Sequence, residues 1–176
     1  MTIWTTRITI RLAAAVGAVL ALALGASQAH ARDGVSPAQT TQLQHQVDNV
    51  LRYGAPGAKQ VNPTTVAWPR DGVILTLPAP GRARIARGPD CPLGYACVWR
   101  DAGYFGLRAA FFHYRTYDLR RYGFPPFTHS GVSSYYNHQS GGAKMFLNTV
   151  EGAFRLRNHA NLTTLNDLGI SVTLKP

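Results

Sequence analysis

One stretch of the sequence decides the expected fold. It reads Cys91-Pro92-Leu93-Gly94-Tyr95-Ala96-Cys97-Val98-Trp99-Arg100-Asp101-Ala102-Gly103-Tyr104-Phe105-Gly106. Four residues separate Trp99 from Tyr104, and Gly106 follows one residue after that, directly downstream of a short loop between two cysteines. Glycine permits a backbone with positive φ, and two aromatic rings can stack over such a corner. The stretch therefore predicts a folded β-hairpin beside a cysteine loop.

The remainder of the chain after Cys91 has the texture of a small β-domain. Aromatic residues are dense, glycines recur every few residues, and no long 3.6-residue periodicity is present. Short strands joined by turns fit this pattern better than helices do. The expected strands are Val98–Trp99, Ala109–His113, Val132–Tyr136, Ala143–Leu147, Ala153–Leu156 and Ile170–Leu174.

The N-terminus resembles a secretory signal peptide. Arg7 and Arg11 precede an apolar run from Leu12 to Leu24, and Ala29-His30-Ala31 forms an A-x-A cleavage pattern. The run is shorter than the roughly 20 residues that a membrane span needs, so we expect cleavage after Ala31 and no transmembrane span in the mature chain. The sequence thus predicts a secreted, extracellular protein.

Export bears on the cysteines and on the charge. Cys91 and Cys97 are the two cysteines of the chain, and in an oxidising compartment we expect them to form a disulfide. The formal charge is +10, from 18 basic and 8 acidic residues; cleavage removes Arg7 and Arg11, which leaves 16 against 8, or +8. Such a charge favours acidic partners but also simply maintains solubility.

A helix and a hairpin are expected between the signal peptide and Cys91. Ser36 is a good N-cap and Pro37 a good first helical residue, so we expect a helix over 37–52 that ends before Gly54. Its apolar face comprises Leu43, Val47, Val50 and Leu51. Two β-rich runs, Thr64–Trp68 and Val73–Leu77, flank turn-forming residues and predict a hairpin. The Pro- and Arg-rich residues 78–89 are typical of a linker.

The stretch from Cys91 to Gly106 resembles the Greek-key signature of βγ-crystallins. With its cysteine loop it is similar to the secreted bacterial metalloproteinase inhibitors of this fold, peptidase inhibitor family thirty-six. Ser133 and Ser134 match the closing strand of the first motif, and residues 146–172 match a second copy. The resemblance covers 90–176. It implies a mainly β, double Greek-key sandwich, preceded by the signal peptide (1–31) and by an N-terminal helix and hairpin appendage with its linker (32–89).

The resemblance also implies a function. Family members inhibit extracellular proteases, metalloproteases among them, through a loop on a rigid β-scaffold. The matching loop here contains Phe154, Arg155, Leu156 and Arg157. The expected partner is an extracellular protease, and we expect a monomer. The alternative is a non-enzymatic, crystallin-like structural or cell-envelope-binding module that holds an anionic polymer.

Calcium binding is not expected. Calcium-binding crystallin-like motifs use an Asn or Asp pair followed by hydroxyl residues. The first copy has His129-Ser130 at the pair, and the second retains Asn166 and Asp167 but has Ile170 at a hydroxyl position. Because calcium requires six to eight oxygen ligands, we expect a degenerate, empty site and no cofactor.

Catalysis and nucleic-acid binding find little support in the sequence. There is no H-E-x-x-H motif, and Gly131-Val132-Ser133-Ser134 is not a nucleophile elbow. The acidic residues form no obvious catalytic pair. Arginines alternate with aromatic residues between Trp99 and Tyr122, but in a small β-domain such aromatics usually belong to the core. We therefore expect neither an enzyme nor a nucleic-acid-binding protein.

Overall fold

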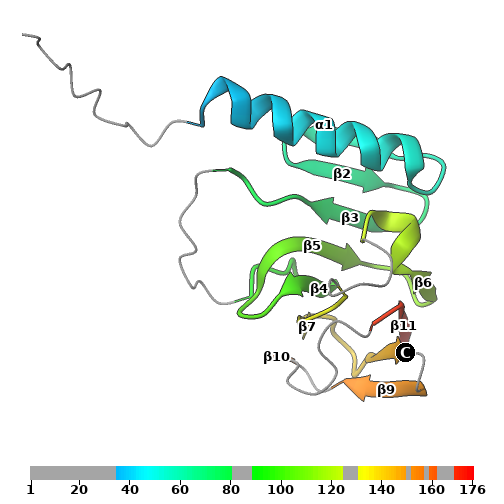
Figure 1. Cartoon of the computed structure of the whole chain (residues 1–176). Coiled ribbons are helices and arrows are strands. Elements are labelled where there is room, and N and C mark those ends of the chain that lie inside the picture. Colours follow the sequence, from blue (N-terminus) through cyan, green and yellow to red (C-terminus); the bar gives the residue numbers. More distant parts are fainter. Residues whose placement is uncertain (1–34, 81–88, 125–130, 150–151, 157–158, 162–168) are drawn as a thin grey trace, which may run out of the picture. The chain divides into compact units, whose positions relative to one another are not determined.

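The computed structural model describes residues 35–80, 89–124, 131–149, 152–156, 159–161 and 169–176, the segment 159–161 by its backbone alone. All of them belong to one compact unit, Arg32–Pro176. The expected signal peptide and most of the expected linker lie outside the described residues. The described part is mainly β, with two antiparallel sheets and one N-terminal helix (Figure 1).

The two sheets draw on strands from different parts of the chain. The larger sheet has the order β1-β2-β3-β5-β4-β7-β10 and the smaller sheet the order β6-β11-β8-β9. The larger sheet contains β1 (Lys59–Asn62), β2 (Thr65–Trp68), β3 (Val73–Thr76), β4 (Ala96–Asp101), β5 (Phe105–Phe111), β7 (Ser134–Asn137) and β10 (His159–Asn161). The smaller sheet contains β6 (Thr116–Asp118), β8 (Lys144–Thr149), β9 (Gly152–Leu156) and β11 (Ser171–Lys175).

The helix α1 (Pro37–Tyr53) confirms the expected helix and ends one residue later than predicted. The N–H of Gln39 donates to the Ser36 hydroxyl (3.2 Å), and the Gln39 side chain accepts from the Ser36 N–H (2.9 Å). This reciprocal cap satisfies two backbone donors that a helix start would leave unpaired. Leu43 and Val47 are buried on the face that α1 turns towards the sheet.

The predicted hairpin is also present. Strands β2 and β3 pair antiparallel with Trp68 opposite Val73, and Gly72 has a φ of 64° in the turn between them. Val66 and Trp68 on β2 and Val73 and Leu75 on β3 are buried, which is the two-residue alternation of a sheet with one covered face.

The hairpin is part of the larger sheet, and this corrects the expectation of an appendage. Strand β3 pairs with β5 from Val73 opposite Phe111 to Thr76 opposite Arg108. Leu43 of α1 belongs to the same hydrophobic core as Met145 of the smaller sheet. The physical reason is that the second edge of β3 needs a hydrogen-bonding partner and its apolar side chains need covering. Strand β5 provides the partner, and the common core covers the side chains.

The two helical elements of the described chain, α1 and the 3₁₀ helix η1 (Leu119–Tyr122), pack near one end of the larger sheet. Near β2 and β3 the cover is α1 together with η1, while the smaller sheet lies at the other end of the unit (Figure 1). The Trp68 indole N–H donates to the carbonyl of Ala55 (2.8 Å), and its ring meets that of Tyr122 edge-on with centroids 5.2 Å apart. The helix, the hairpin and the β-domain thus share one core.

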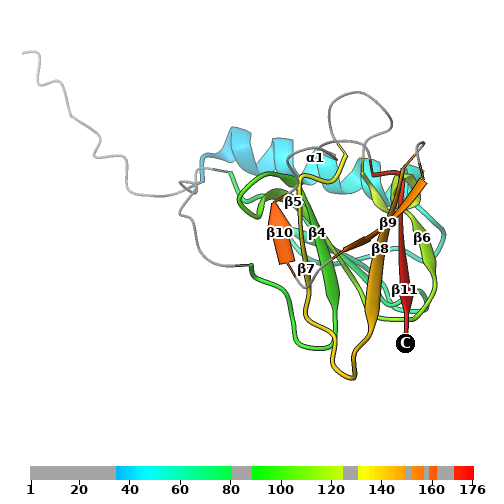
Figure 2. The same ribbon diagram turned by 90° about the horizontal axis from the view of Figure 1, so that it is seen from below.

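The chain exchanges a strand between the sheets twice. Strand β6 follows β5 in sequence but pairs with β11, and β10 follows β9 but pairs with β7. Each sheet therefore contains one strand whose neighbours along the chain lie in the other sheet. Figure 2 shows β8 and β11 side by side, away from β4 and β7.

The six strands expected after Cys91 each overlap an observed strand, namely β4, β5, β7, β8, β9 and β11, with shifts at their ends. Strands β1, β6 and β10 were not predicted; they are short and lie at sheet edges.

Candidate functional site

The predicted signature hairpin joins β4 to β5, and its two aromatic residues meet. The rings of Trp99 and Tyr104 lie edge-on, with centroids 5.2 Å apart and planes at 78°. Trp99 is buried and Tyr104 is partly exposed. Tyr104 has a φ of 65°, an uncommon value for a residue with a Cβ, and partial burial raises the pKa of its hydroxyl. The two rings cover a sharply turned backbone.

Gly106 is required at this corner for two reasons. Its φ is 78°, in the left-handed region. A Cβ on Gly106 would also lie 2.5 Å from an Asp101 carboxylate oxygen, far inside contact distance. That carboxylate is paired with Arg100 at 2.9 Å. The glycine therefore lets the carboxylate approach the backbone of the hairpin.

The two signature serines close the hairpin from β7 and the residue before it. The Ser134 hydroxyl accepts from the N–H of Tyr104 (3.1 Å) and donates to the carbonyl of Asp101 (2.8 Å). The N–H of Ser133 donates to the carbonyl of Trp99 (2.9 Å), and both serines are buried. The structure thus brings Trp99, Tyr104, Gly106, Ser133 and Ser134 together in one corner.

The predicted disulfide between Cys91 and Cys97 is present, with the two Cα atoms 5.9 Å apart. The N–H of Gly94 donates to the carbonyl of His138 (2.9 Å), and His138 Nδ1 lies 2.7 Å from the carbonyl oxygen of Cys91. These bonds hold the cysteine loop against the end of β7. Leu93, at the tip of the loop, is 75% exposed.

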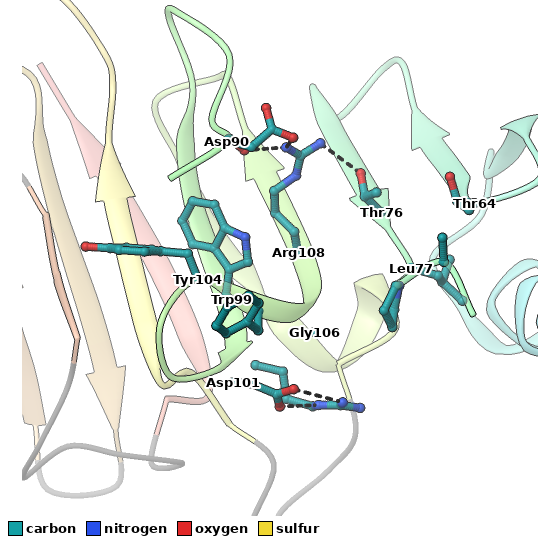
Figure 3. A pocket seen from close by; sticks show the side chains of 13 residues that line it. Thr64, Thr76, Leu77, Asp90, Trp99, Asp101, Tyr104, Gly106 and Arg108 are labelled. Atoms are coloured by element: carbon teal, nitrogen blue, oxygen red, sulfur yellow. Dashed lines mark hydrogen bonds and ion pairs between the residues drawn. The ribbon is translucent and has the colours of Figure 1, made fainter. Parts of the chain in front are cut away.

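A surface cavity of about 530 Å³ lies beside the signature hairpin. Figure 3 shows Arg108 on its wall, between Asp90 and Thr76. The Arg108 guanidinium pairs with the Asp90 carboxylate at 2.8 Å and donates to the Thr76 hydroxyl at 2.9 Å. Its buried Nε–H has no partner among the described residues.

The chemistry of this cavity is that of balanced charges. The described residues of its walls include two Arg–Asp ion pairs, Arg108 with Asp90 and Arg100 with Asp101, and no histidine or cysteine. Each of these two carboxylates is held by an arginine. The walls can hydrogen-bond a small polar molecule without favouring either sign of charge.

The expected inhibitory loop is a strand in the structure. Phe154, Arg155 and Leu156 lie on β9, paired with β8 so that Phe146 faces Arg155; Arg157 lies outside the described residues. This confirms the strand expected over Ala153–Leu156 and places three of the four candidate inhibitory residues on it. The physical reason is that Phe154 and Leu156 alternate with Arg155, so both apolar side chains are partly buried while Arg155 is exposed. Strand β9 is an edge strand of the smaller sheet.

The residues of the expected empty calcium site are only partly described. Asn166 and Asp167 lie outside the described residues, as do His129 and Ser130. Ile170 is described, and its carbonyl accepts from the N–H of Leu119 (3.1 Å). In the described part of the chain, no group of three or more His, Cys, Asp or Glu residues could hold a metal ion.

Sequence reasoning missed a polar network around Asp71. The Asp71 carboxylate pairs with Arg115 (2.9 Å) and accepts from the Tyr122 hydroxyl (3.0 Å). The nearby Tyr117 hydroxyl donates to the carbonyl of His113 (2.9 Å), and burial raises its pKa to about 12. The network fastens the β2–β3 turn to the connection between β5 and β6. Only the turn-forming Asp71 could have drawn attention to it from sequence.

The remaining observations concern membranes and known proteins. Among the described residues, no helix combines the length and the apolar character that crossing a membrane requires. Comparison with known proteins identifies no relative: no protein-family model, curated protein or solved structure matches this chain.

Proposed function

We propose that this chain is an exported, non-enzymatic protein of βγ-crystallin-like architecture that inhibits an extracellular protease. The observation that carries the proposal is the corner in which Trp99, Tyr104 and Gly106 meet Ser134. Those residues were selected from the sequence by their resemblance to the Greek-key signature of a family of secreted metalloproteinase inhibitors.

The strand order gives the scaffold assignment independent support. In a double Greek key, two groups of four strands each contribute their third strand to the other group's sheet. The exchange of β6 and β10 between the sheets fits that scheme, with β4, β5, β6 and β7 as the first group and β8, β9, β10 and β11 as the second. Strands β1, β2 and β3 then extend the first group's sheet next to β5.

The proposed inhibitory element is the edge strand β9. Proteases bind peptides in extended conformations, and an edge strand offers extended backbone for pairing with another chain. Strand β9 is held along its whole length by β8, from Thr149 opposite Gly152 to Met145 opposite Leu156. Because this pairing fixes the backbone in advance, little conformational entropy is lost when a protease binds.

Side chains on β9 supply the specificity in this proposal. Arg155 is exposed and can reach an acidic subsite, while the partly buried Phe154 and Leu156 anchor the strand to its own sheet. Proteases cleave mobile segments more readily than segments that are held in place, so the anchoring of β9 opposes its cleavage. Export belongs to the same proposal, and a disulfide between Cys91 and Cys97 is consistent with it.

The test is inhibition of purified secreted proteases by the mature protein. We expect slow-turnover inhibition of at least one metalloprotease and about tenfold or greater weakening by Arg155→Glu, which reverses the charge at the contact. Arg70→Glu is the matched control, because Arg70 is an exposed arginine in the β2–β3 turn. If no protease is inhibited, or if β9 is cut at the rate of an ordinary peptide, the proposal fails.

A further inference from the structure

The outward side of the smaller sheet carries a basic face with an aromatic residue at its centre. We define the basic face as Lys144, Phe146, Arg155 and Lys175. Register places these side chains on one side: Phe146 is opposite Arg155, and Lys144 is opposite Lys175. The residues between them on β8 and β11, Met145, Leu147, Val172 and Leu174, are buried on the other side. The basic face is therefore the solvent side of the sheet.

Positive charge is concentrated on this face. Lys144 and Lys175 are directly opposite each other, an arrangement that is unfavourable for two like charges in a sheet. Opposite side chains have Cβ atoms about 5 Å apart, and diagonal ones about 7–8 Å, which places Arg155 within reach of Lys144. Lys144 donates to the carbonyl of Pro176 (3.0 Å), and Lys175 lies 5.3 Å from the centre of the Phe146 ring.

The Asp side chains whose ion pairs are described do not neutralise the basic face. Among the described side chains on its outward side, the one carboxylate is that of Asp118, which is paired with Arg120 at 2.6 Å. The hydrogen bond from Arg120 lowers the Asp118 pKa, so this pair persists into acid. Asp71, Asp90 and Asp101 are likewise paired with arginines elsewhere. An external anion would relieve the repulsion between Lys144 and Lys175.

Neutral polar groups continue the face beside the cations. The Asn148 amide donates to the hydroxyls of Ser171 and Thr173, both at 2.9 Å, and the Thr116 and Thr173 hydroxyls lie 2.8 Å apart. Each hydroxyl has further hydrogen-bonding capacity, because it can accept twice and donate once. Next to the cations lies the partly exposed ring of Phe146, an apolar surface on which a sugar ring can rest.

We infer that the basic face binds an anionic polysaccharide, a sugar chain with carboxylate or sulfate groups. The cations match its acidic groups, the hydroxyl and amide row matches its hydroxyls, and the Phe146 ring matches the apolar side of a sugar. An extended polymer can follow the open surface of a sheet. Arg155 is shared with the proposed inhibitory strand, whereas Lys144, Phe146 and Lys175 belong to the basic face alone. Binding of the polysaccharide would hold the protein at an acidic cell surface.

The experiment measures binding of the mature protein to immobilised heparin and to alginate, with neutral dextran as the uncharged control. We expect binding to the two acidic polymers alone. Lys144→Gln with Lys175→Gln should weaken binding about 25-fold at low salt, since each charge near an anionic surface contributes about fivefold. The dependence on salt should also become shallower. Phe146→Leu should weaken binding without changing the salt dependence.

A matched double variant separates a site from general charge. Lys59→Gln with Arg70→Gln removes the same charge from exposed positions on β1 and in the β2–β3 turn, and we expect less than about threefold weakening. Equal weakening by the two double variants, equal binding of dextran, or a preference for DNA over both polysaccharides would overturn the inference. Thermal melts establish that the variants fold. Protease inhibition should survive Lys144→Gln with Lys175→Gln, so the two proposals can fail separately.

Discussion

Gly106→Ala tests why the signature corner needs glycine. The glycine could serve the backbone conformation, or it could make room for the Asp101 carboxylate close to the backbone. Alanine at a φ of 78° is strained, and a left-handed residue with a Cβ costs about 1–2 kcal/mol. At Gly106 the new methyl would also lie 2.5 Å from the Asp101 carboxylate and would displace it. An off-rotamer side chain costs about 0.5–1.5 kcal/mol, and the exposed pair with Arg100 at most about 1 kcal/mol. We therefore expect a total loss of about 2–4 kcal/mol.

Gly141→Ala is the matched control for this substitution. Gly141 has a φ of 72°, but a Cβ there would have nothing within 4 Å. Its substitution should therefore report conformational strain alone, about 1–2 kcal/mol. Urea unfolding followed by the fluorescence of the buried tryptophans Trp68 and Trp99 gives the unfolding free energy of each variant.

A double-mutant cycle then isolates the contact with Asp101. In Asp101→Ala the carboxylate is absent, so Gly106→Ala should cost about 1 kcal/mol less in that background than in the parent. If Gly106→Ala and Gly141→Ala destabilise equally, within about 0.5 kcal/mol, and the cycle shows no coupling, close approach of the carboxylate does not select glycine at this corner.

Three further expectations concern the disulfide, a buried tyrosine and calcium. Cys91→Ser with Cys97→Ser should lower the unfolding free energy by about 2–2.5 kcal/mol, the chain-entropy value for a loop whose ends are 6 residues apart, and an unchanged urea midpoint would contradict this. The Tyr117 pKa is raised from 10.0 to about 12, so its contribution is complete below pH 10 and is lost as the pH rises towards 12; Tyr117→Phe should remove part of that loss in pH-dependent melts. Melts in millimolar calcium and in chelator should coincide, because Ile170 replaces a hydroxyl ligand; a rise in melting temperature of about 10 °C would show otherwise.

Local sequence signals predicted the local structure of this chain. The helix over 37–53 follows from the Ser36 cap and its apolar spacing, and the β2–β3 hairpin follows from turn residues that end in Gly72. The corner between Trp99 and Gly106 was predictable from local sequence alone. The spacing of its aromatic residues predicts the ring pair, and the glycine predicts the positive φ. In each case the residues that determine the geometry lie within a few positions of one another.

Long-range pairings were not predictable in the same way. Nothing in the sequence of β3 specifies that Val73 should lie opposite Phe111. Any strand with alternating buried residues could form the same backbone hydrogen bonds with the edge of β3. The hydrogen bond from Tyr122 to Asp71 joins residues 51 positions apart. The alternation of Phe154, Arg155 and Leu156 predicted the strand itself, but its position at the sheet edge depends on pairing with β8 and could not be read from these residues.

The pairing of β3 with β5 has a consequence for the region before Cys91. A peptide cut between β3 and β4 would leave residues 35–80 attached, because four residue pairs join β3 to β5 and the side chains of Leu43 and Val47 remain in the common core. Release would uncover the edge of β5 and the Phe111 and Tyr122 rings, which pack with Trp68 and its neighbours. Apolar burial of this kind contributes about 25 cal/mol for each Å² removed from water, so its loss would destabilise the part left behind. We therefore predict that the helix and hairpin stay bound to the rest of the domain after such a cut.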